Sequence, residues 1–363
     1  MQITATPEQI SLYYREGTSD KVYQIQIVPE GTEFLVNFAF GRRGSTLNTG
    51  TKTSSPVPYE RAKSIFDKLV KEKQAKGYTV GESGTPYRHT AKEAQSTGIH
   101  CQLLNPIEEH DIRTYINHPE YWAQEKYDGK RLLIRKEGTQ VTGINRKGLE
   151  VGLPESLVKA ANQIPGSFIM DGECVGETFF TFDLLFRGTE DLRPLDYRDR
   201  LTALTNLMAS GMQKSIKLAD TAFEPDQKLY MLAQLKKGNK EGIVFKYIYA
   251  PYTAGRPNTG GPQLKHKFYA TLSAVVAQIN QQRSVELQLL HERGWVKAGN
   301  VTVPANQPIP APGAIIEVRY LYAFRESGFL YQPTFLGVRA DLIAPDCTVN
   351  QLKYKPSTEM EEA

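Results

Sequence analysis

The segment Lys126–Arg131, KYDGKR, decides the interpretation of this chain. It stands before residues 132–136, LLIRK, which are predicted to form a β-strand. Asp and Gly favour tight turns, so the segment fits an ordinary turn that leads into this strand. A lysine amine can also act as a nucleophile in covalent catalysis. Because a short K-x-D-G pattern recurs by chance, both interpretations stay open on this segment alone.

Seven further short segments that follow KYDGKR in the chain contain residues that could take part in the same chemistry. In order, they are 145–148 (NRKG), 171–173 (DGE), 179–185 (FFTFDLL), 241–246 (EGIVFK), 252–256 (YTAGR), 264–267 (LKHK) and 328–341 (GFLYQPTFLGVRAD). In identity and order the set resembles the covalent nucleotidyltransferase superfamily, specifically the ATP-dependent DNA ligases. The resemblance covers roughly residues 99 to 345, and its last segment is similar to the motif that closes the OB domain of ligases.

The resemblance implies a reaction in three steps with ATP and Mg²⁺, for which Mn²⁺ can substitute. Lys126 takes AMP from ATP, AMP passes to the 5′-phosphate at a nick, and the adjacent 3′-OH displaces it. Lys126 must attack as a neutral amine, although a free lysine titrates near about 10.4. Cations nearby disfavour the ammonium form and stabilise charge on the phosphates; Lys265, Lys267 and Mg²⁺ are expected to do both.

The resemblance also implies a role for individual residues. Asp128 and Glu241 are expected to bind the metal ion, and Arg131 and Arg146 to engage the 5′-phosphate of the nick. The residues expected to contact ATP or AMP are Gln124, Arg131 and Glu173 at the ribose and base, Phe182 stacked on adenine, Lys246, and Arg339 at the pyrophosphate.

Two of these assignments have ordinary structural alternatives. Phe182 is also the kind of aromatic residue that is commonly buried in a core strand. Arg339 and Asp341 also fit a solvated surface pair. Leu342 stands where related ligases commonly have a lysine, so the cation that orients pyrophosphate is left in doubt.

A second resemblance lies near the N-terminus. Residues 40–45, FGRRGS, with the preceding strand 21–28 and the basic helix that follows, resemble a WGR domain over about residues 8 to 78. This module is known from poly(ADP-ribose) polymerases, where it touches DNA near breaks. The resemblance implies that Phe40, in place of the usual Trp, stacks near a DNA end, and that Arg42, Arg43 and Lys52 contact phosphates. A solvated basic loop is the alternative.

Periodicity and turn residues predict a multi-domain α+β chain. The expected strands are 22–28, 34–40, 132–136, 167–170, 179–185, 242–246, 272–279, 285–290, 295–303 and 314–324, and the expected helices are 58–76 and 198–208. The predicted domains are a WGR-like module (1–80), a linker (81–98), an ATP-grasp-like adenylation domain (99–270), an OB-fold β-barrel (271–350) and an acidic, disordered tail (351–363).

Composition narrows the class of protein. Hydrophobic residues make up 40% and charged residues 23% of 363 residues, and the net charge is +4, which is ordinary for a soluble globular protein. No apolar run is long enough to span a membrane. Three widely spaced cysteines favour a reducing, cytoplasmic setting. The chain has no P-loop and no zinc-binding spacing of Cys or His.

The sequence therefore predicts a monomeric ATP-dependent DNA ligase that acts on nicked double-stranded DNA, and its compact form fits a phage or a mobile element. Three alternatives stay open. One is a ligase that accepts RNA in one or both strands, because contacts to the 2′-OH cannot be inferred from these segments. Another is an mRNA guanylyltransferase of the same superfamily. The third is a non-catalytic protein that binds DNA breaks through an inactive ligase core.

Overall fold

The computed structural model describes residues 8–16, 19–80, 87–209 and 214–356. They form two compact units. The first contains the described residues up to Glu224 together with Phe245–Leu264, and the second contains Pro225–Val244 and the described residues from Lys265 onward. Part of the predicted linker, 81–86, and the end of the predicted tail, 357–363, lie outside the described residues.

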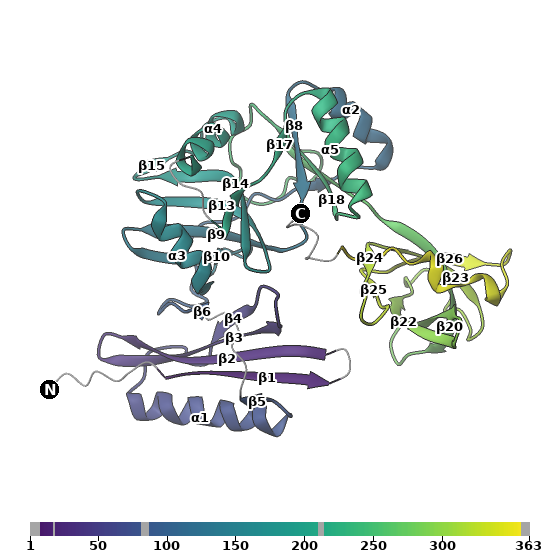
Figure 1. The fold of residues 1–363 in the computed structure, drawn as a ribbon, viewed down its shortest axis with the longest axis horizontal. Helices are drawn as coiled ribbons and strands as arrows, with labels where there is room; N and C mark the ends of the chain where they lie inside the picture. The colour runs from purple at the N-terminus through teal and green to yellow at the C-terminus, as the bar shows by residue number, and fades with distance from the viewer. Residues whose placement is uncertain (1–7, 17–18, 81–86, 210–213, 357–363) are drawn as a thin grey trace. The chain divides into compact units, whose positions relative to one another are not determined.

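The N-terminal part of the first unit is an antiparallel sheet covered by one helix. Its strand order is β4-β3-β2-β1-β5, with β1 (Gln9–Glu16), β2 (Ser19–Glu30), β3 (Glu33–Arg42), β4 (Asn48–Thr51) and β5 (Thr79–Val80). Figure 1 shows α1 (Tyr59–Ala75) lying along the sheet. Ala62, Phe66 and Leu69 of α1 pack on Ile25 and Val36 of the strands, because apolar side chains recur on one face of the helix.

The rest of the first unit contains a seven-stranded sheet. Its main path runs β11-β10-β9-β13-β14-β15, and β16 pairs with β14. The bounds are β9 (Lys130–Glu137), β10 (Gln140–Asn145), β11 (Glu150–Val151), β13 (Phe168–Val175), β14 (Thr178–Arg187), β15 (Glu190–Asp191) and β16 (Ile216–Leu218). Helices α3 (Glu155–Gln163) and α4 (Tyr197–Met208) bury apolar side chains in the core of this sheet.

A second sheet carries the strand that leads into KYDGKR. Its order is β17-β8-β18-β19-β7, with β7 (Asn105–Pro106), β8 (Tyr121–Lys126), β17 (Thr221–Ala222), β18 (Gly242–Tyr247) and β19 (Gln263–Lys267). The boundary between the two units falls within β18 and β19. The remaining elements of this region are β6 (Tyr87–Arg88), which pairs with β12 (Leu153–Pro154), a 3-10 helix (Glu109–Asp111), α2 (Ile112–Asn117) and α5 (Pro225–Lys237).

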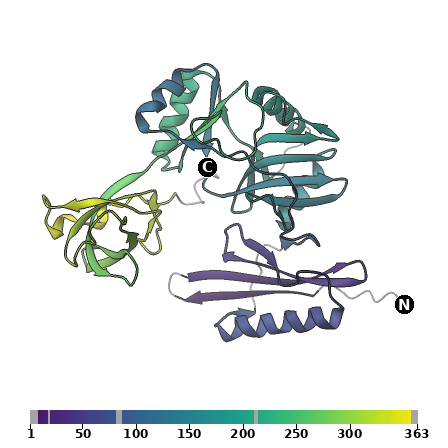
Figure 2. The ribbon, with the colours of Figure 1, turned by 180° about the vertical axis from the view of Figure 1, so that it is seen from behind.

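The C-terminal part of the second unit is all β apart from two 3-10 turns, and Figure 2 shows it from behind. Its sheet has the order β22-β21-β20-β23-β26, and β24 pairs with β25. The bounds are β20 (Ala270–Ile279), β21 (Ser284–His291), β22 (Gly294–Thr302), β23 (Ile315–Tyr320), β24 (Tyr322–Ala323), β25 (Leu330–Tyr331), β26 (Thr334–Arg339) and the 3-10 turns Ala344–Asp346 and Val349–Gln351. The described pairings do not close this sheet into a barrel.

The predicted strands and helices are confirmed with small shifts of their ends. The structure also contains elements that were not predicted, and the predicted strand 314–324 is divided into β23 and β24. The longer unpredicted elements are β1, β4, β8, β10, β19, β26, α2, α3 and α5. Among the described residues, no helix is long and apolar enough to cross a membrane.

One ion pair lies in the interior of the first unit. The guanidinium of Arg200 on α4 donates from Nε and Nη2 to the two carboxylate oxygens of Asp183 on β14, at 2.8 and 2.9 Å. Both side chains are essentially fully buried. An unpaired charge would be strongly unfavourable here, so the two residues depend on each other.

We expect Asp183→Ala to lower the free energy of unfolding by about 3 to 5 kcal/mol, because it leaves the guanidinium of Arg200 buried without its partner. Asp191→Ala is the matched control: it breaks the bidentate pair with Arg193, whose exposed position makes its expected cost about 0 to 1 kcal/mol. Urea denaturation of the two variants measures the difference. Equal losses would contradict the assignment of the buried pair as a major stabilising contact.

Candidate active site

KYDGKR connects two strands of the first unit. β8 ends at Lys126 and β9 begins at Lys130, so 127–129 form the connection, as the turn interpretation predicts. Lys126 and Asp128 are both partly buried. Gly129 is required for a steric reason, because a Cβ at this position would collide with the carbonyl oxygen of Cys174. The ring of Tyr127 stacks on Phe180 of β14, with centroids 4.2 Å apart.

Phe182 lies on β14 beside two cations. The guanidinium carbon of Arg131 is 4.6 Å from the centre of its ring, and Nζ of Lys246 is 4.2 Å from it. The ring is 8% exposed. The structure thus brings together three of the residues expected at the nucleotide, from β9, β14 and β18.

Arg131 is held by a buried carboxylate. Its Nε and Nη2 donate to the two oxygens of Asp171, each at 2.7 Å, and Nη2 also donates to the carbonyl of Gln102 at 3.2 Å. The hydroxyl of Tyr252 donates to the same carboxylate at 2.7 Å. Asp171 therefore fixes the orientation of the guanidinium beside the Phe182 ring.

Lys246 is a fully buried amine with an altered pKa. Burial lowers its pKa to about 7; Asp183 opposes the shift, while Arg131 and Arg200 add to it. Its Nζ donates to the carbonyl of Phe182 at 3.4 Å and lies over the ring of Tyr197 at 4.6 Å. Of the residues expected to bind nucleotide, this one has the environment that most disfavours its charge.

Gln124 is positioned from within the core. It is buried, and its Nε2 donates to the hydroxyl of Tyr197 at 3.1 Å and to Oγ1 of Thr221 at 2.9 Å. The hydroxyl of Tyr197 in turn donates to the carbonyl of Phe182 at 3.1 Å. The amide two residues before Lys126 is thereby tied to the strand that carries Phe182.

Two further expected residues lie on the seven-stranded sheet. Glu173 on β13 is partly buried and is the cross-strand neighbour of Arg131 on β9 and of Phe180 on β14. Arg146 is exposed in the turn after β10. Glu173 therefore lies close to the Phe182 cluster, while Arg146 is open to solvent.

The remaining expected catalytic residues belong to the second unit. Nζ of Lys267 is 2.9 Å from a carboxylate oxygen of Glu241 and donates to Oε1 of Gln332 at 3.0 Å. Burial alone would lower the pKa of Lys267, but the Glu241 carboxylate raises it above its ordinary value. Lys265 precedes it by two residues on β19 and is partly buried. Glu241, the predicted metal ligand, thus forms an ion pair with Lys267, which is expected to stabilise charge on the phosphates.

Arg339 is at the end of β26 in the same unit. Its Nε and Nη2 donate to the carboxylate of Asp341 at 2.7 and 2.6 Å, and Nη1 is 3.5 Å from Glu317. The contact with Arg339 lowers the pKa of Asp341 to about 2. Leu342 packs against the apolar core of this unit, so it does not act as the cation found at this position in related ligases.

The N-terminal residues expected at DNA lie on β3 or close to it. Phe40 is 41% exposed, and its ring is 5.9 Å from that of Tyr23 and 6.0 Å from that of Phe38. Lys52 is exposed, with its Nζ over the Phe38 ring. Lys52 and the partly buried Phe38 therefore lie beside Phe40, while the Tyr23 ring is buried in the core of the domain.

The two arginines of the FGRRGS segment differ in their surroundings. Arg42 is exposed at the end of β3. Arg43 donates from Nη2 and Nε to the carboxylate of Asp20, at 2.9 and 3.2 Å. A phosphate contact by Arg43 would have to compete with this ion pair.

The residues that orient this cluster were not predicted from the sequence; they are Asp171, Asp183, Arg200, Tyr197 and Tyr252. For Arg200, the sequence itself contains a sign of its buried position. Arg200 stands on the same helical stripe as Leu204 and Leu207, and an arginine on a buried stripe requires a carboxylate partner. The identity of that partner depends on tertiary contacts.

Comparison with known proteins agrees with both resemblances. Residues 9–85 match the WGR domain family, so the chain contains a WGR domain. It is 26% identical over 211 residues to a probable DNA ligase of Kineococcus radiotolerans, an alignment that spans 50% of this chain and 39% of that protein. It is 30% identical over 189 residues to a probable DNA ligase of Mycobacterium marinum, spanning 42% and 36%. The chain thus covers about two fifths of the length of these curated relatives.

Solved structures show the same fold. A structure from a structure-function analysis of Lig E DNA ligases matches 66% of this chain and 99% of its own, with a TM-score of 0.50 and 20% identity. The predicted resemblance to DNA ligases is therefore confirmed in sequence similarity and in fold.

The lowered pKa of Lys246 predicts a pH dependence of stability. Between about pH 7 and its ordinary value of 10.5, the folded chain holds fewer protons on this amine than the unfolded chain does, so stability rises with pH in this window. Relative to Lys246→Met, the wild type should gain about 2 to 3 kcal/mol from about pH 7 to about pH 9. Chemical denaturation of both proteins across this range measures the difference, and parallel curves would show that the amine keeps its charge when buried.

Proposed function

We propose that this chain is an ATP-dependent DNA ligase that seals 5′-phosphate/3′-OH nicks through a lysyl-AMP intermediate at Lys126. The observation that carries the proposal is the surroundings of Phe182, where Arg131 and Lys246 lie over the ring. Similarity to proteins named probable DNA ligases supports the choice of activity. The chain's own residues supply the nucleophile, the surface for the base and the cations for the phosphates.

The charge balance near Phe182 favours an anionic ligand. Asp171 and Asp183 carry two negative charges, and Arg131, Arg200 and Lys246 would carry three positive ones. The pKa of Lys246 is lowered to about 7, chiefly by burial and in part by the two neighbouring arginines. A bound nucleotide would add negative charge beside the cluster. This supports assigning Arg131 and Lys246 to the nucleotide, with Glu173 at the ribose and Gln124 near the base.

Two residues, Asp128 and Glu241, are proposed as ligands of the metal ion. Among the described residues, no group of three or more His, Cys, Asp or Glu side chains could hold a metal ion. Mg²⁺ commonly binds one or two carboxylates together with substrate phosphates, and Asp128 and Glu241 are each proposed as such a ligand because of their carboxylate side chains. The ion would neutralise phosphate charge when bound. Glu241 would first have to release Lys267, whose amine would then be available to a phosphate.

We further propose the domain division 1–80, 81–98, 99–270, 271–350 and 351–363, with an OB-type barrel in the fourth part. The antiparallel order β22-β21-β20-β23-β26 supports a small five-stranded barrel in which Arg339 orients pyrophosphate. Arg146 and Arg131 would engage the nick 5′-phosphate, and the protein would act as a monomer on nicked duplex.

Lys126→Ala tests the central step. We expect wild type incubated with ATP and Mg²⁺ to gain one AMP on Lys126, detected by mass spectrometry, and to seal a 5′-phosphorylated nick, whereas the variant does neither. Lys159→Ala is the control, because that lysine is exposed and pairs with Glu155 one turn away on α3. Absence of an AMP adduct on the wild-type Lys126 would overturn the proposal.

The alternatives give different results in the same assay. Labelling with GTP and not ATP would identify a guanylyltransferase. Substrates with DNA or RNA on each side of the nick separate a DNA ligase from an RNA-joining enzyme. A chain that binds nicked DNA and forms no adduct would be the non-catalytic break-binding protein.

The WGR domain is proposed to bind DNA through the surface around Phe40. We expect Phe40→Ala to raise the Kd for nicked duplex by about 5- to 100-fold, because stacking of a base on an aromatic ring contributes about 1 to 3 kcal/mol. Val80→Ala is the control on the same domain, since Val80 is also exposed. Titration of a fluorescent nicked duplex measures both; equal affinities for all three proteins would exclude this surface.

A further inference from the structure

The WGR domain contacts the strands next to the proposed nucleophile. The loop between β3 and β4 reaches the hairpin that joins β13 to β14. Oγ1 of Thr46 lies 3.2 Å from the carbonyl oxygen of Cys174 and 3.1 Å from that of Gly176, so its hydroxyl donates to this hairpin. Both partners belong to the first unit.

A second bond from the same loop reaches the segment that follows Lys126. Nζ of Lys130 donates to Oδ1 of Asn48 at 2.9 Å. Lys130 is the first residue of β9 and follows Gly129 directly. An ammonium donor makes this a charge-assisted hydrogen bond, which is stronger than a bond between neutral groups.

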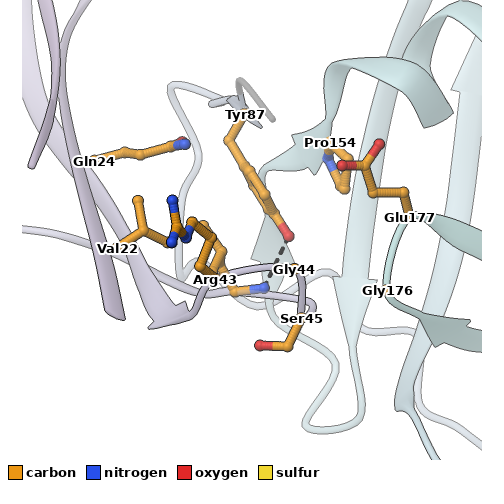
Figure 3. Close-up of a pocket in the computed structure, with 10 residues that line it drawn as sticks. Val22, Gln24, Arg43, Gly44, Ser45, Tyr87, Pro154, Gly176 and Glu177 are labelled. Atoms are coloured by element: carbon orange, nitrogen blue, oxygen red, sulfur yellow. Dashed lines mark hydrogen bonds between the residues drawn. The ribbon is translucent and has the colours of Figure 1, made fainter. Parts of the chain in front are cut away.

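The contact between the two parts is packed around these bonds. Tyr87 and Leu47 share an apolar cluster with Tyr13, Val22 and Ala39, and the hydroxyl of Tyr87 accepts a hydrogen bond from the backbone N–H of Leu47 at 2.9 Å. Figure 3 shows this bond beside a pocket of about 220 Å³ whose labelled lining residues come from both sides of the contact. Three consecutive residues, Thr46, Leu47 and Asn48, therefore each form a hydrogen bond across the contact.

The two bonds converge on one piece of backbone. Cys174 is the cross-strand partner of Lys130, and the carbonyl oxygen that accepts from Thr46 is the one against which Gly129 packs without room for a Cβ. Movement of that carbonyl would displace the backbone at Gly129. Thr46 and Asn48 thus contact the strands on the β9 side of the bend that follows Lys126.

We propose that Thr46 and Asn48 are positioning residues for lysine adenylation, so that the WGR domain acts on the chemical step as well as on DNA. This inference rests on the proposed ligase function. A domain that only raised affinity for DNA would have no effect on AMP transfer from ATP to Lys126, a step that involves no DNA. A domain that orders the 126–130 segment changes the rate of this step.

The test measures single-turnover adenylation of the full chain with ATP and Mg²⁺ and without DNA. Thr46→Val keeps the shape of the side chain and removes the hydroxyl, and Asn48→Ala removes the acceptor for Lys130. We expect each variant to adenylate about 3- to 10-fold more slowly than wild type, the rate equivalent of one hydrogen bond, with the KM for ATP unchanged. Thr46→Ser retains the hydroxyl and should restore the rate.

Thr79→Val is the matched control, because Thr79 lies on β5 of the same domain and its hydroxyl donates to the carbonyl of Tyr13 within that domain. A double-mutant cycle of Asn48→Ala with Lys130→Met adds a second measurement: the two effects should not add if the bond between these residues is what matters. Thermal unfolding of every variant identifies any that fold poorly.

The outcomes separate the two proposals. If wild type forms no AMP adduct, the ligase function fails. If wild type is adenylated and Thr46→Val and Asn48→Ala react at its rate, the ligase function stands and the positioning role is overturned. The positioning role is also overturned if Thr46→Ser is as slow as Thr46→Val, or if the variants lose affinity for nicked DNA alone.

Discussion

Two buried carboxylates on neighbouring strands of the first unit each require a cationic partner. Asp171 and Asp183 are cross-strand partners on β13 and β14, and both are buried. Such a pair is unfavourable unless each charge is neutralised. Arg131 from β9 pairs with one and Arg200 from α4 with the other, so the sheet and the helix are tied together by charge as well as by apolar contact.

This pairing explains the geometry around Phe182. Because Asp171 holds the guanidinium of Arg131 by two bonds, that cation stays over the Phe182 ring. Tyr197, on the helix that carries Arg200, donates to the Phe182 carbonyl and accepts from Gln124. The proposed nucleotide surface is therefore preorganised by the residues packed behind it, which is how an active site avoids reorganisation during reaction.

The N-terminal domain also contacts the strands next to the proposed nucleophile, through Thr46 and Asn48. Its exposed aromatic surface around Phe40 and the loop that carries Thr46 lie on strands β3 and β4 or between them. Side chains that favour nucleic acid and side chains that contact the catalytic hairpin therefore share one sheet.

The sequence by itself determined many of the elements. Alternating apolar residues predicted β2, helical spacing predicted α1, and the turn preferences of Asp and Gly fitted KYDGKR to a bend after Lys126, because these patterns depend on neighbours in the chain. The division of strand 314–324 and the helices α3 and α5 escaped prediction. Only the tertiary structure decided which polar groups meet: it forms the ion pairs of Arg131 with Asp171 and of Lys267 with Glu241, and the hydrogen bond from Lys130 to Asn48. Those partners are distant in sequence, and the cost of burying a charge is set by the packed surroundings.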